Sequence, residues 1–504
     1  MKSNQLKIGV LLSYASTAIT ILIQLFYMPV MIQLLGQSEY GLYSLVSSVV
    51  SYLSLFSLGF TGAYLRFFAR SYHDWEKLAS LNGMFLSLFS LLAALAAICG
   101  TILSCFPRQI FGSNLSPGEL AKARVLMLIL VANIAITLIS GIFDAMIGAH
   151  EQFVFLRVVG LVSTIASPFL TLPLLLMGYG SVMLVIMTTG ITLVRFAVNV
   201  WFCFCRLKIP VSFHGFQWGL LKEITVFSSF LLLNMVIDQI NWNVDKLILS
   251  HTNGTGEIAV YGVASQFNSL VLTFSTTISS VFSPRVNRIA AEDSPHVQAA
   301  FTDLMARVGR IQWMILGLLT GGFIVFGKYF ITHIYAGPEY ENAYETALLL
   351  VIPVLIPLIQ NIGIEMQRAL NKHQFRSIIY LLIAISNVAV SIPLAQRWGA
   401  VGAALGTAIS LLVGNGLIMN IFYHKVLKID MKYFWKEILK TWKGFLLPVL
   451  LAAVIMRRGS FEGMGSFLLS AFVFLVVYCA SVFAFSCNGA EKAMIFGMLK
   501  RKCV

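Results

Sequence analysis

The sequence predicts an all-α polytopic membrane protein with about 14 transmembrane helices: two parallel-repeat six-helix lobes plus two C-terminal helices. Composition is the first indication. Of the 504 residues, 58% are hydrophobic and 11% are charged, and the mean hydropathy is +0.85, whereas about 25% of the residues of a soluble domain are charged. The second is a series of apolar stretches long enough to cross a bilayer, and the third is an internal repeat with an offset of about 219 residues.

The apolar stretches fill almost the whole chain, and the gaps between them are too short for a soluble domain. A helix needs roughly 20 apolar residues to cross a hydrocarbon core of about 30 Å. The predicted spans are 8–34, 41–65, 82–106, 123–147, 155–177, 181–204, 223–249, 257–283, 311–335, 344–367, 377–396, 400–423, 444–456 and 465–486.

The thirteenth span is short, since it lies between Lys443 and Arg457. If it did not cross, the basic residues near the C-terminus, such as Lys500, would face outward, against the charge bias of the other loops. We therefore expect a tilted or thinned crossing, with Lys443, Arg457 and Arg458 extending toward the interfaces.

Charge predicts the orientation. Most of the 35 Lys and Arg residues lie in connections or at span ends on one side of the membrane, and Arg195 and Lys246 are among the few that lie within spans. Basic side chains resist translocation, so the N- and C-termini of this multi-pass membrane protein are expected to be cytoplasmic. The first stretch is too long for a cleaved signal peptide and lacks a small-residue cleavage pattern.

The net charge of +14 is explained by this topology, and no nucleic acid partner is expected, because the basic residues are scattered over short loops. One segment differs, because its lysines recur every three or four residues beside an apolar face. It predicts a helix on the anionic inner leaflet, with a solvated connector as the alternative. The lysines are Lys425, Lys428, Lys432, Lys436, Lys440 and Lys443.

No metal, cofactor or catalytic site is predicted. The seven cysteines form no C-x-x-C pair and the eight histidines form no His-x-x-x-His pair. A membrane glycosyltransferase or polysaccharide polymerase should show an acidic metal motif in a loop or a large outer loop, and neither is present. The chain is therefore not expected to be an enzyme.

The internal repeat is indicated by residues that match, in the same order, between the two halves of the sequence. Gly36, Glu39 and Tyr43 after the first span correspond to Gly254, Glu257 and Tyr261 after the seventh. Further matches are Arg66 with Arg285, Gln152-Phe153 with Gln374-Phe375, Pro173 with Pro393, and Gly180 with Gly399. Six spans per repeat is an even number, so both halves enter from the same side. The predicted division is 1–210, 211–424 and a basic amphipathic segment with two helices at 425–504, and the substrate site is expected between the lobes.

Five spans carry polar residues at steps of three or four, which puts them on one helical face. Polar side chains that must hydrogen-bond do not face lipid, so each stripe should face protein or an aqueous cavity, although packing between helices is the alternative interpretation. The charged stripes are Asn234, Asp238, Asn241 and Asp245 in span seven, Asn133, Thr137, Ser140 and Asp144 in span four, and Thr188, Thr192, Arg195 and Asn199 in span six. Spans one (with Gln24) and eight are uncharged.

The charged residues suggest gating or ion coupling. Asp144 and Glu365 occupy similar positions in the two repeats and, with Arg66 and Arg285, predict ion pairs that open and close at the inner mouth, or static pairs. Asp238 and Asp245 are candidates for coupling to a proton or sodium ion, with Lys246 able to neutralise Asp245. A permanent ion pair between Asp238 and Arg195 is the alternative.

The run Gly36-x-x-Glu39-Tyr40-Gly41-Leu42-Tyr43, then Ser57-Leu58-Gly59-Phe60 through Arg66, and Asn243-Val244-Asp245-Lys246-Leu247-Ile248 before Gly256-Glu257 and Tyr261 resemble the bacterial polysaccharide flippase family. That family belongs to the multidrug/oligosaccharidyl-lipid/polysaccharide exporter superfamily, whose members have two six-helix lobes that alternate around a central cavity.

The resemblance implies that the cargo is an undecaprenyl-pyrophosphate-linked oligosaccharide flipped to the outer leaflet. It implies partnership with membrane lipids, a polysaccharide polymerase and glycosyltransferases. Arg66, Arg195 and Arg285 would capture pyrophosphate, and Asn234, Asn241 and Gln24 would bind cargo. A cation-coupled multidrug antiporter and a lipid II flippase are the alternatives, and both are disfavoured by the uncharged polar stripe of span one.

Overall fold

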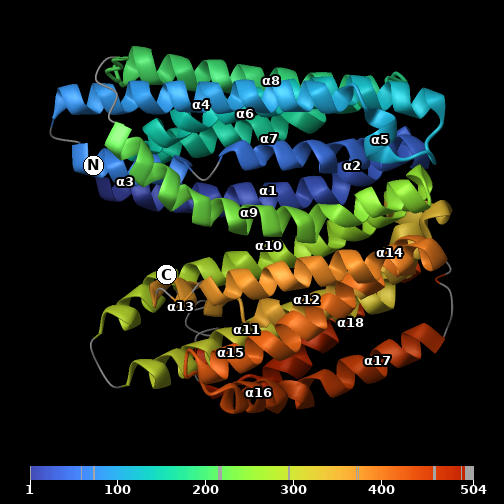
Figure 1. Cartoon of the computed structure of the whole chain (residues 1–504). Helices are drawn as coiled ribbons and strands as arrows, with labels where there is room; N and C mark the ends of the chain where they lie inside the picture. Colours follow the sequence, from blue (N-terminus) through green and yellow to red (C-terminus); the bar gives the residue numbers. More distant parts are fainter. Residues whose placement is uncertain are drawn as a thin grey trace. The chain divides into compact units, whose positions relative to one another are not determined.

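The computed structural model describes residues 2–57, 60–71, 74–213, 218–292, 296–370, 372, 374–457, 461, 463–489 and 491–493. Every regular element among these residues is a helix (Figure 1). The chain divides into two compact units, Met1–Gly262 with Ala395–Ala403, and Val263–Leu394 with Ala404–Val504. The boundaries predicted at 210 and 424 remain a prediction.

The helices from the N-terminus to the start of the second unit are α1 (Lys2–Leu35), α2 (Gln37–Ser51), η1 (Tyr52–Ser57), α3 (Phe60–Ser71), α4 (Trp75–Ser104), α5 (Pro107–Phe111), α6 (Pro117–Ala149), α7 (Phe153–Leu176), α8 (Ser181–Trp201), η2 (Phe202–Arg206), α9 (Trp218–Thr252) and α10 (Thr255–Ala291). The remaining helices are α11 (Val297–Tyr329), η3 (Phe330–Tyr335), η4 (Pro338–Tyr340), α12 (Asn342–Ile359), α13 (Ile362–Ala369), α14 (Gln374–Leu411), η5 (Leu412–Ile418), α15 (Met419–Lys425), α16 (Met431–Leu439), η6 (Lys440–Phe445), α17 (Leu446–Arg457), α18 (Met464–Ser481) and η7 (Val482–Ser486).

The membrane fold predicted from the sequence is confirmed. Twelve helical segments among the described residues are long and apolar enough to cross a bilayer. One of them, Phe375–Lys425, contains non-helical backbone at Trp398 and Gly399, where two predicted spans meet. The 35-residue helix α9 covers the predicted seventh span. Gly399 has a φ of +55°, which a glycine adopts without a steric penalty.

Two predicted spans are interrupted. The second comprises α2, η1 and α3, and the tenth comprises α12 and the short α13, which carries Glu365. Pro353 and Pro357 lie in the second half of α12. Each lacks a backbone N–H and so removes an intrahelical hydrogen bond, which explains why α12 ends at Ile359.

Polar side chains cap the N-terminal ends of several helices. The Asp74 side chain accepts a hydrogen bond from the Lys77 N–H at the start of α4, and Asp430 accepts from two N–H groups at the start of α16. Ser116 and Glu119 form a reciprocal capping box at the start of α6, where Pro117 occupies the first turn. These side chains satisfy backbone donors that have no partner within the helix.

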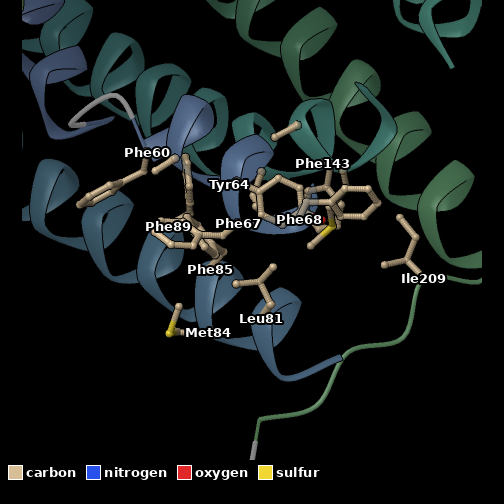
Figure 2. Packing of buried hydrophobic residues seen from close by; sticks show 14 of the residues in the cluster. Phe60, Tyr64, Phe67, Phe68, Leu81, Met84, Phe85, Phe89, Phe143 and Ile209 are labelled. Atoms are coloured by element: carbon tan, nitrogen blue, oxygen red, sulfur yellow. The ribbon is translucent and has the colours of Figure 1, made fainter. Parts of the chain in front are cut away.

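An aromatic cluster fixes the short helix α3 in the first unit (Figure 2). Tyr64 of α3 packs edge-to-face on Phe85 of α4, and Phe60 packs in the same way on Phe89. The Tyr64 hydroxyl donates to Asn82 Oδ1 at 2.8 Å, and Asn82 Nδ2 donates to the Pro210 carbonyl at 2.9 Å. This packing sets the position of the backbone that carries Arg66.

The basic helix α16 buries one part of its apolar surface in the protein and exposes another. Met431, Phe434 and Ile438 are buried, whereas Leu439 and the nearby Trp442 are exposed, so contact with the inner leaflet remains a prediction. Phe434 lies on Gly309 of α11, where a side chain would leave no room for the ring. The lysines of α16 remain exposed.

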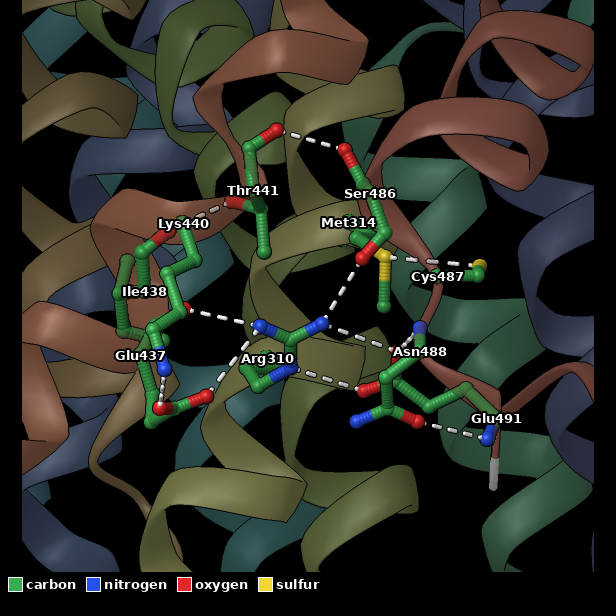
Figure 3. A network of polar contacts seen from close by, with 10 residues as sticks. All are labelled: Arg310, Met314, Glu437, Ile438, Lys440, Thr441, Ser486, Cys487, Asn488 and Glu491. Carbon is green, nitrogen blue, oxygen red and sulfur yellow. Dashed lines mark hydrogen bonds and ion pairs between the residues drawn. The ribbon is translucent and has the colours of Figure 1, made fainter.

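A buried guanidinium joins α11 to the end of the second unit (Figure 3). Arg310 is 5% exposed and forms two hydrogen bonds with Glu491, at 2.9 Å and 3.1 Å. It also donates to the carbonyl oxygens of Ser486 at 2.8 Å and Glu437 at 3.0 Å. The bidentate geometry is the strong arrangement for this pair of groups, so it holds α16 and the segment after η7 against α11.

Candidate functional site: a polar cavity in the first unit

The polar faces predicted for spans four and six meet each other. Near one end, Asn133 Nδ2 of α6 donates to Thr189 and Thr192 of α8 at 3.2 Å and 3.1 Å. Further along, Arg195 of α8 donates to Asp144 Oδ2 at 3.0 Å, and Asn199 donates to Asp144 Oδ1 at 2.8 Å. Both oxygens of Asp144 are therefore bonded to α8.

A cavity of about 280 Å³ opens beside the Asp144–Arg195 pair. The side chains of Asp144 and Arg195 are 30% and 39% exposed, because they reach into this space. The cavity lining comes from α6, α7 and α8 and consists of Thr137, Ser140, Asp144, Gly160, Ser163, Thr164, Ser167, Thr188, Ile191, Thr192 and Arg195.

The residues contributed by α7 were not predicted. A signal for them was present in the sequence, because small and hydroxyl-bearing residues recur at helical spacing within this span. They are Gly160, Ser163, Thr164 and Ser167. They carry no charge, so they are less conspicuous than the stripes on α6 and α8. Together the three helices build a cavity that is rich in hydroxyl groups within a membrane-spanning bundle.

Of the four residues predicted to gate the inner mouth, the two carboxylates, Asp144 and Glu365, bond to groups other than Arg66 and Arg285. Asp144 bonds to Arg195 and Asn199, as described above. Glu365 forms an ion pair with Arg368 at 2.9 Å and accepts from the Ser283 hydroxyl at 3.1 Å. The side chains of Arg66 on α3 and Arg285 on α10 are exposed. Arg195, the alternative partner considered for Asp238, is bonded to Asp144.

The stripe on α9 divides between buried and exposed positions. Asp245 is fully buried and accepts from the Tyr261 hydroxyl at 2.5 Å. Asp238 is exposed, while Asn241 and Lys246 are half-buried. Gln24 of α1 is also half-buried, and the side chain of Asn234 lies outside those that the structure describes.

A second polar face of α9 escaped the sequence analysis. Asn243 Nδ2 donates to Gln239 Oε1 at 2.5 Å, and Gln239 bonds in turn to Ser51 and Ser54 near the junction of α2 and η1. Gln239 and Asn243 are four residues apart, so the helical spacing was visible. The proximity of α2 was not, because it depends on how distant helices pack.

The two repeats make the same hydrogen bond at equivalent positions. Glu39 Oε1 accepts from the Ser181 backbone N–H at 2.6 Å, directly after Gly180. Glu257 Oε2 accepts from the Ala400 backbone N–H at 2.7 Å, directly after Gly399. In both cases the carboxylate beyond the first span of a repeat caps the helix of its sixth span. This equivalence supports the predicted duplication.

The N-terminal ends of α2 and α10 are in close contact. A Cβ atom on Gly41 would lie 2.0 Å from the Thr255 carbonyl oxygen, so only glycine fits. Glu119 Oε1 accepts from the hydroxyl groups of Ser38 at 2.7 Å and Thr255 at 2.8 Å. The helices that begin at the two copies of the Gly-x-x-Glu motif are therefore joined through α6.

Comparison with known proteins gives the family. A family described as polysaccharide biosynthesis protein matches residues 30–313, more than half of the chain. A putative O-antigen transporter of Shigella flexneri is 21% identical over 401 residues, which are 78% of this chain and 91% of that protein.

Solved structures share the fold. The lipid II flippase MurJ in an inward closed conformation aligns with a TM-score of 0.75 and 17% identity over 95% of this chain and 98% of its own. An inward-facing multidrug resistance MATE family transporter of the MOP superfamily aligns with a TM-score of 0.62 and 13% identity, over 83% and 98% of the two chains.

The relatives are named as a putative O-antigen transporter, a lipid II flippase and a multidrug transporter, and the chain is similar to each of them. The helical two-lobed fold, the polar cavity within the bundle and the match over residues 30–313 lead to one conclusion. The chain belongs to the polysaccharide biosynthesis protein family.

Proposed function

We propose that this protein moves an undecaprenyl-pyrophosphate-linked oligosaccharide from the cytoplasmic to the outer leaflet of the bacterial cytoplasmic membrane by alternating access. A sugar head group cannot cross hydrocarbon without polar partners, whereas its polyprenyl tail is stable there. The flippase therefore has to supply hydrogen-bonding groups within the depth of the bilayer.

The observation that carries the proposal is the hydroxyl-lined cavity beside Asp144 and Arg195. Polar residues at this depth are expensive unless they serve a ligand, water or one another. Gln24 and Asn241 are half-buried polar groups on other helices and are further candidates for cargo contact, as is Asn234.

We assign capture of the pyrophosphate to Arg66 and Arg285. Their side chains are exposed, and a guanidinium can bind phosphate oxygens through two parallel hydrogen bonds. Arg195 was a third candidate from the sequence. It is less suited to an anion, because the Asp144 carboxylate lies 3.0 Å from its Nη2 atom.

The proposed orientation follows from the charge bias, with both termini cytoplasmic. Glycosyltransferases would then complete the cargo on the inner leaflet, and a polymerase would use it on the outer leaflet. Membrane lipids form the remaining surroundings.

The test uses the full chain in liposomes with a lipid-linked oligosaccharide that carries a fluorophore on its glycan. Dithionite outside the liposomes quenches only outward-facing label, so additional quenching over time reports flipping. Wild type should flip this cargo faster than protein-free liposomes. The double variant Arg66→Ala, Arg285→Ala should be at least about tenfold slower, since a charge-assisted hydrogen bond contributes about 1.5–3 kcal/mol. Arg124→Ala removes an exposed arginine from α6 and is the matched control.

A cation-coupled drug antiporter is the second candidate. The observation in its favour is the exposed carboxylate of Asp238 on α9. The same liposomes loaded with a cationic dye or with labelled lipid II distinguish the candidates. Wild type that moved the dye or lipid II but not the lipid-linked oligosaccharide would overturn the proposal.

A further inference from the structure

The hydroxyl groups of the first-unit cavity have a common orientation. Five of them donate to carbonyl oxygens three or four residues earlier in their own helix, at distances from 2.8 Å to 3.0 Å. They are Thr137, Ser163, Thr164, Thr188 and Thr192. A hydroxyl that has donated its proton still has lone pairs available, so it acts as an acceptor toward the cavity. Thr192 already accepts from Asn133 in this way.

The Asp144–Arg195 pair supplies hydrogen-bond donors to the cavity, whereas the hydroxyl groups supply acceptors. Both oxygens of Asp144 are bonded, to Arg195 and to Asn199. Of the guanidinium nitrogens of Arg195, only Nη2 is bonded among the described residues. A guanidinium carries five N–H donors, so most of those on Arg195 remain available to a ligand in the cavity that it lines.

These properties decide which class of ligand fits. A phosphate group would face a carboxylate and a set of acceptor oxygens, which repel an anion. A metal cation would face the guanidinium, which repels a cation. A neutral polyhydroxylated ring suits the site, because each hydroxyl can donate to a Ser or Thr oxygen and accept from Arg195.

Size restricts the ligand further. The cavity volume of about 280 Å³ is near the lower end of the range for small-molecule sites, roughly 300–1,000 Å³. It suits a single sugar residue and is too small for an extended chain.

We infer that this cavity binds one neutral sugar residue of the cargo, separately from the groups that hold the pyrophosphate. The inference rests on the proposed function and deepens it. Selection of the glycan would then reside in the first unit, on α6, α7 and α8, and the arginines Arg66 and Arg285 would recognise every pyrophosphate-linked cargo alike.

The test compares the binding of two probes to the full chain in lipid nanodiscs. One is the lipid-linked oligosaccharide of the producing bacterium, and the other is undecaprenyl pyrophosphate without sugar. The variant Ser163→Ala, Thr164→Val removes two acceptors with little change in shape. It should weaken binding of the sugar-bearing probe about tenfold, because two hydrogen bonds to the sugar are lost, and leave binding of the sugarless probe unchanged. Thr346→Val is the matched control, because Thr346 makes the same bond to its own helix, on α12, and does not line the cavity.

The arginine variants separate the two proposals. Arg66→Ala, Arg285→Ala should weaken both probes. Equal weakening of both probes by the cavity variant, or no weakening of either, would overturn the sugar assignment alone. Wild type that bound neither probe more tightly than protein-free nanodiscs do would overturn the proposed function and the sugar assignment together. Thermal unfolding of each variant shows whether the fold is intact.

Discussion

At the scale of residues, Asp144 is the centre of the polar cavity, because it bonds to both charged and uncharged groups of α8. Removing it leaves Arg195 without its carboxylate partner within the bundle. The pair is about one-third exposed, so its loss is expected to be less severe than that of a fully buried pair.

We expect Asp144→Ala and Arg195→Ala each to lower the free energy of unfolding by about 1–2 kcal/mol, because each strands one charge. The double variant should lose less than the sum of the single losses, since it strands neither. Thermal or denaturant unfolding in detergent measures all three variants. Additive losses would show that the two side chains act independently.

Asp238 is the candidate residue for coupling transport to an ion. Its carboxylate is exposed on α9, the helix that covers the predicted seventh span, and binding of a proton or sodium ion there would favour one orientation of the transporter. If it couples transport to an ion, Asp238→Asn should abolish the dependence of flipping on an imposed proton or sodium gradient in liposomes.

Trp242→Ala, which removes an exposed side chain about one turn further along α9, is the control and should leave the gradient dependence in place. Wild-type transport that ignores both gradients would remove the coupling role from Asp238.

Much of the cavity was predictable at this scale and part of it was not. The spacing of Asn133, Thr137, Ser140 and Asp144 correctly placed a polar face on one side of a helix. Spacing does not reveal which helix lies opposite, so the Asp144–Arg195 pair and the residues of α7 required the structure.

At the scale of elements, the carboxylates Glu39 and Glu257 each cap the helix of the sixth span in their own repeat. Glu39 also accepts from the Ser181 hydroxyl at 2.8 Å and forms an ion pair with Lys122 at 3.2 Å. The helix N-terminus favours negative charge, so each contact stabilises the first turn.

Glu39→Ala should therefore increase amide hydrogen exchange in the first turn of α8 by about fivefold, as expected for the loss of a cap that contributes about 1 kcal/mol. Glu257→Ala should do the same at residues 400–403. Glu76→Ala, which removes an exposed carboxylate from the first turn of α4, is the control. Exchange at α8 that does not change would exclude the capping role.

The helices themselves were largely predictable, since hydropathy alone located every span. The breaks were not. The interruption between α12 and α13 follows Pro353 and Pro357, which remove backbone hydrogen bonds, and an average over apolar residues is insensitive to that loss. The break at Trp398–Gly399 is the exception, because the gap between two predicted spans marked it.

At the scale of the whole molecule, the charge bias predicts the topology. Single cysteines placed at Ser38 and Asn253 should react with an impermeant reagent from outside intact cells. Cysteines at His73, Ser294 and Lys500, which lie outside the described residues, should react only after the membrane is permeabilised. Labelling of residue 500 from outside would contradict the arrangement of fourteen spans.

The Arg310 site has a consequence for the way the protein is made. Its ion-pair partners Glu437 and Glu491 are encoded 127 and 181 residues later, so the ribosome completes α11 long before the guanidinium can be neutralised. During synthesis the nascent chain therefore carries an unmatched charge until these carboxylates are added, and we expect membrane quality control to recognise a chain in which Glu491 is missing. Glu491→Ala should shorten the half-life in pulse-chase labelling, because a buried pair that loses one partner is destabilised by about 3–5 kcal/mol. Adding Arg310→Met should restore the half-life. A Glu491→Ala protein that persists as long as wild type would show that the cell does not monitor this site.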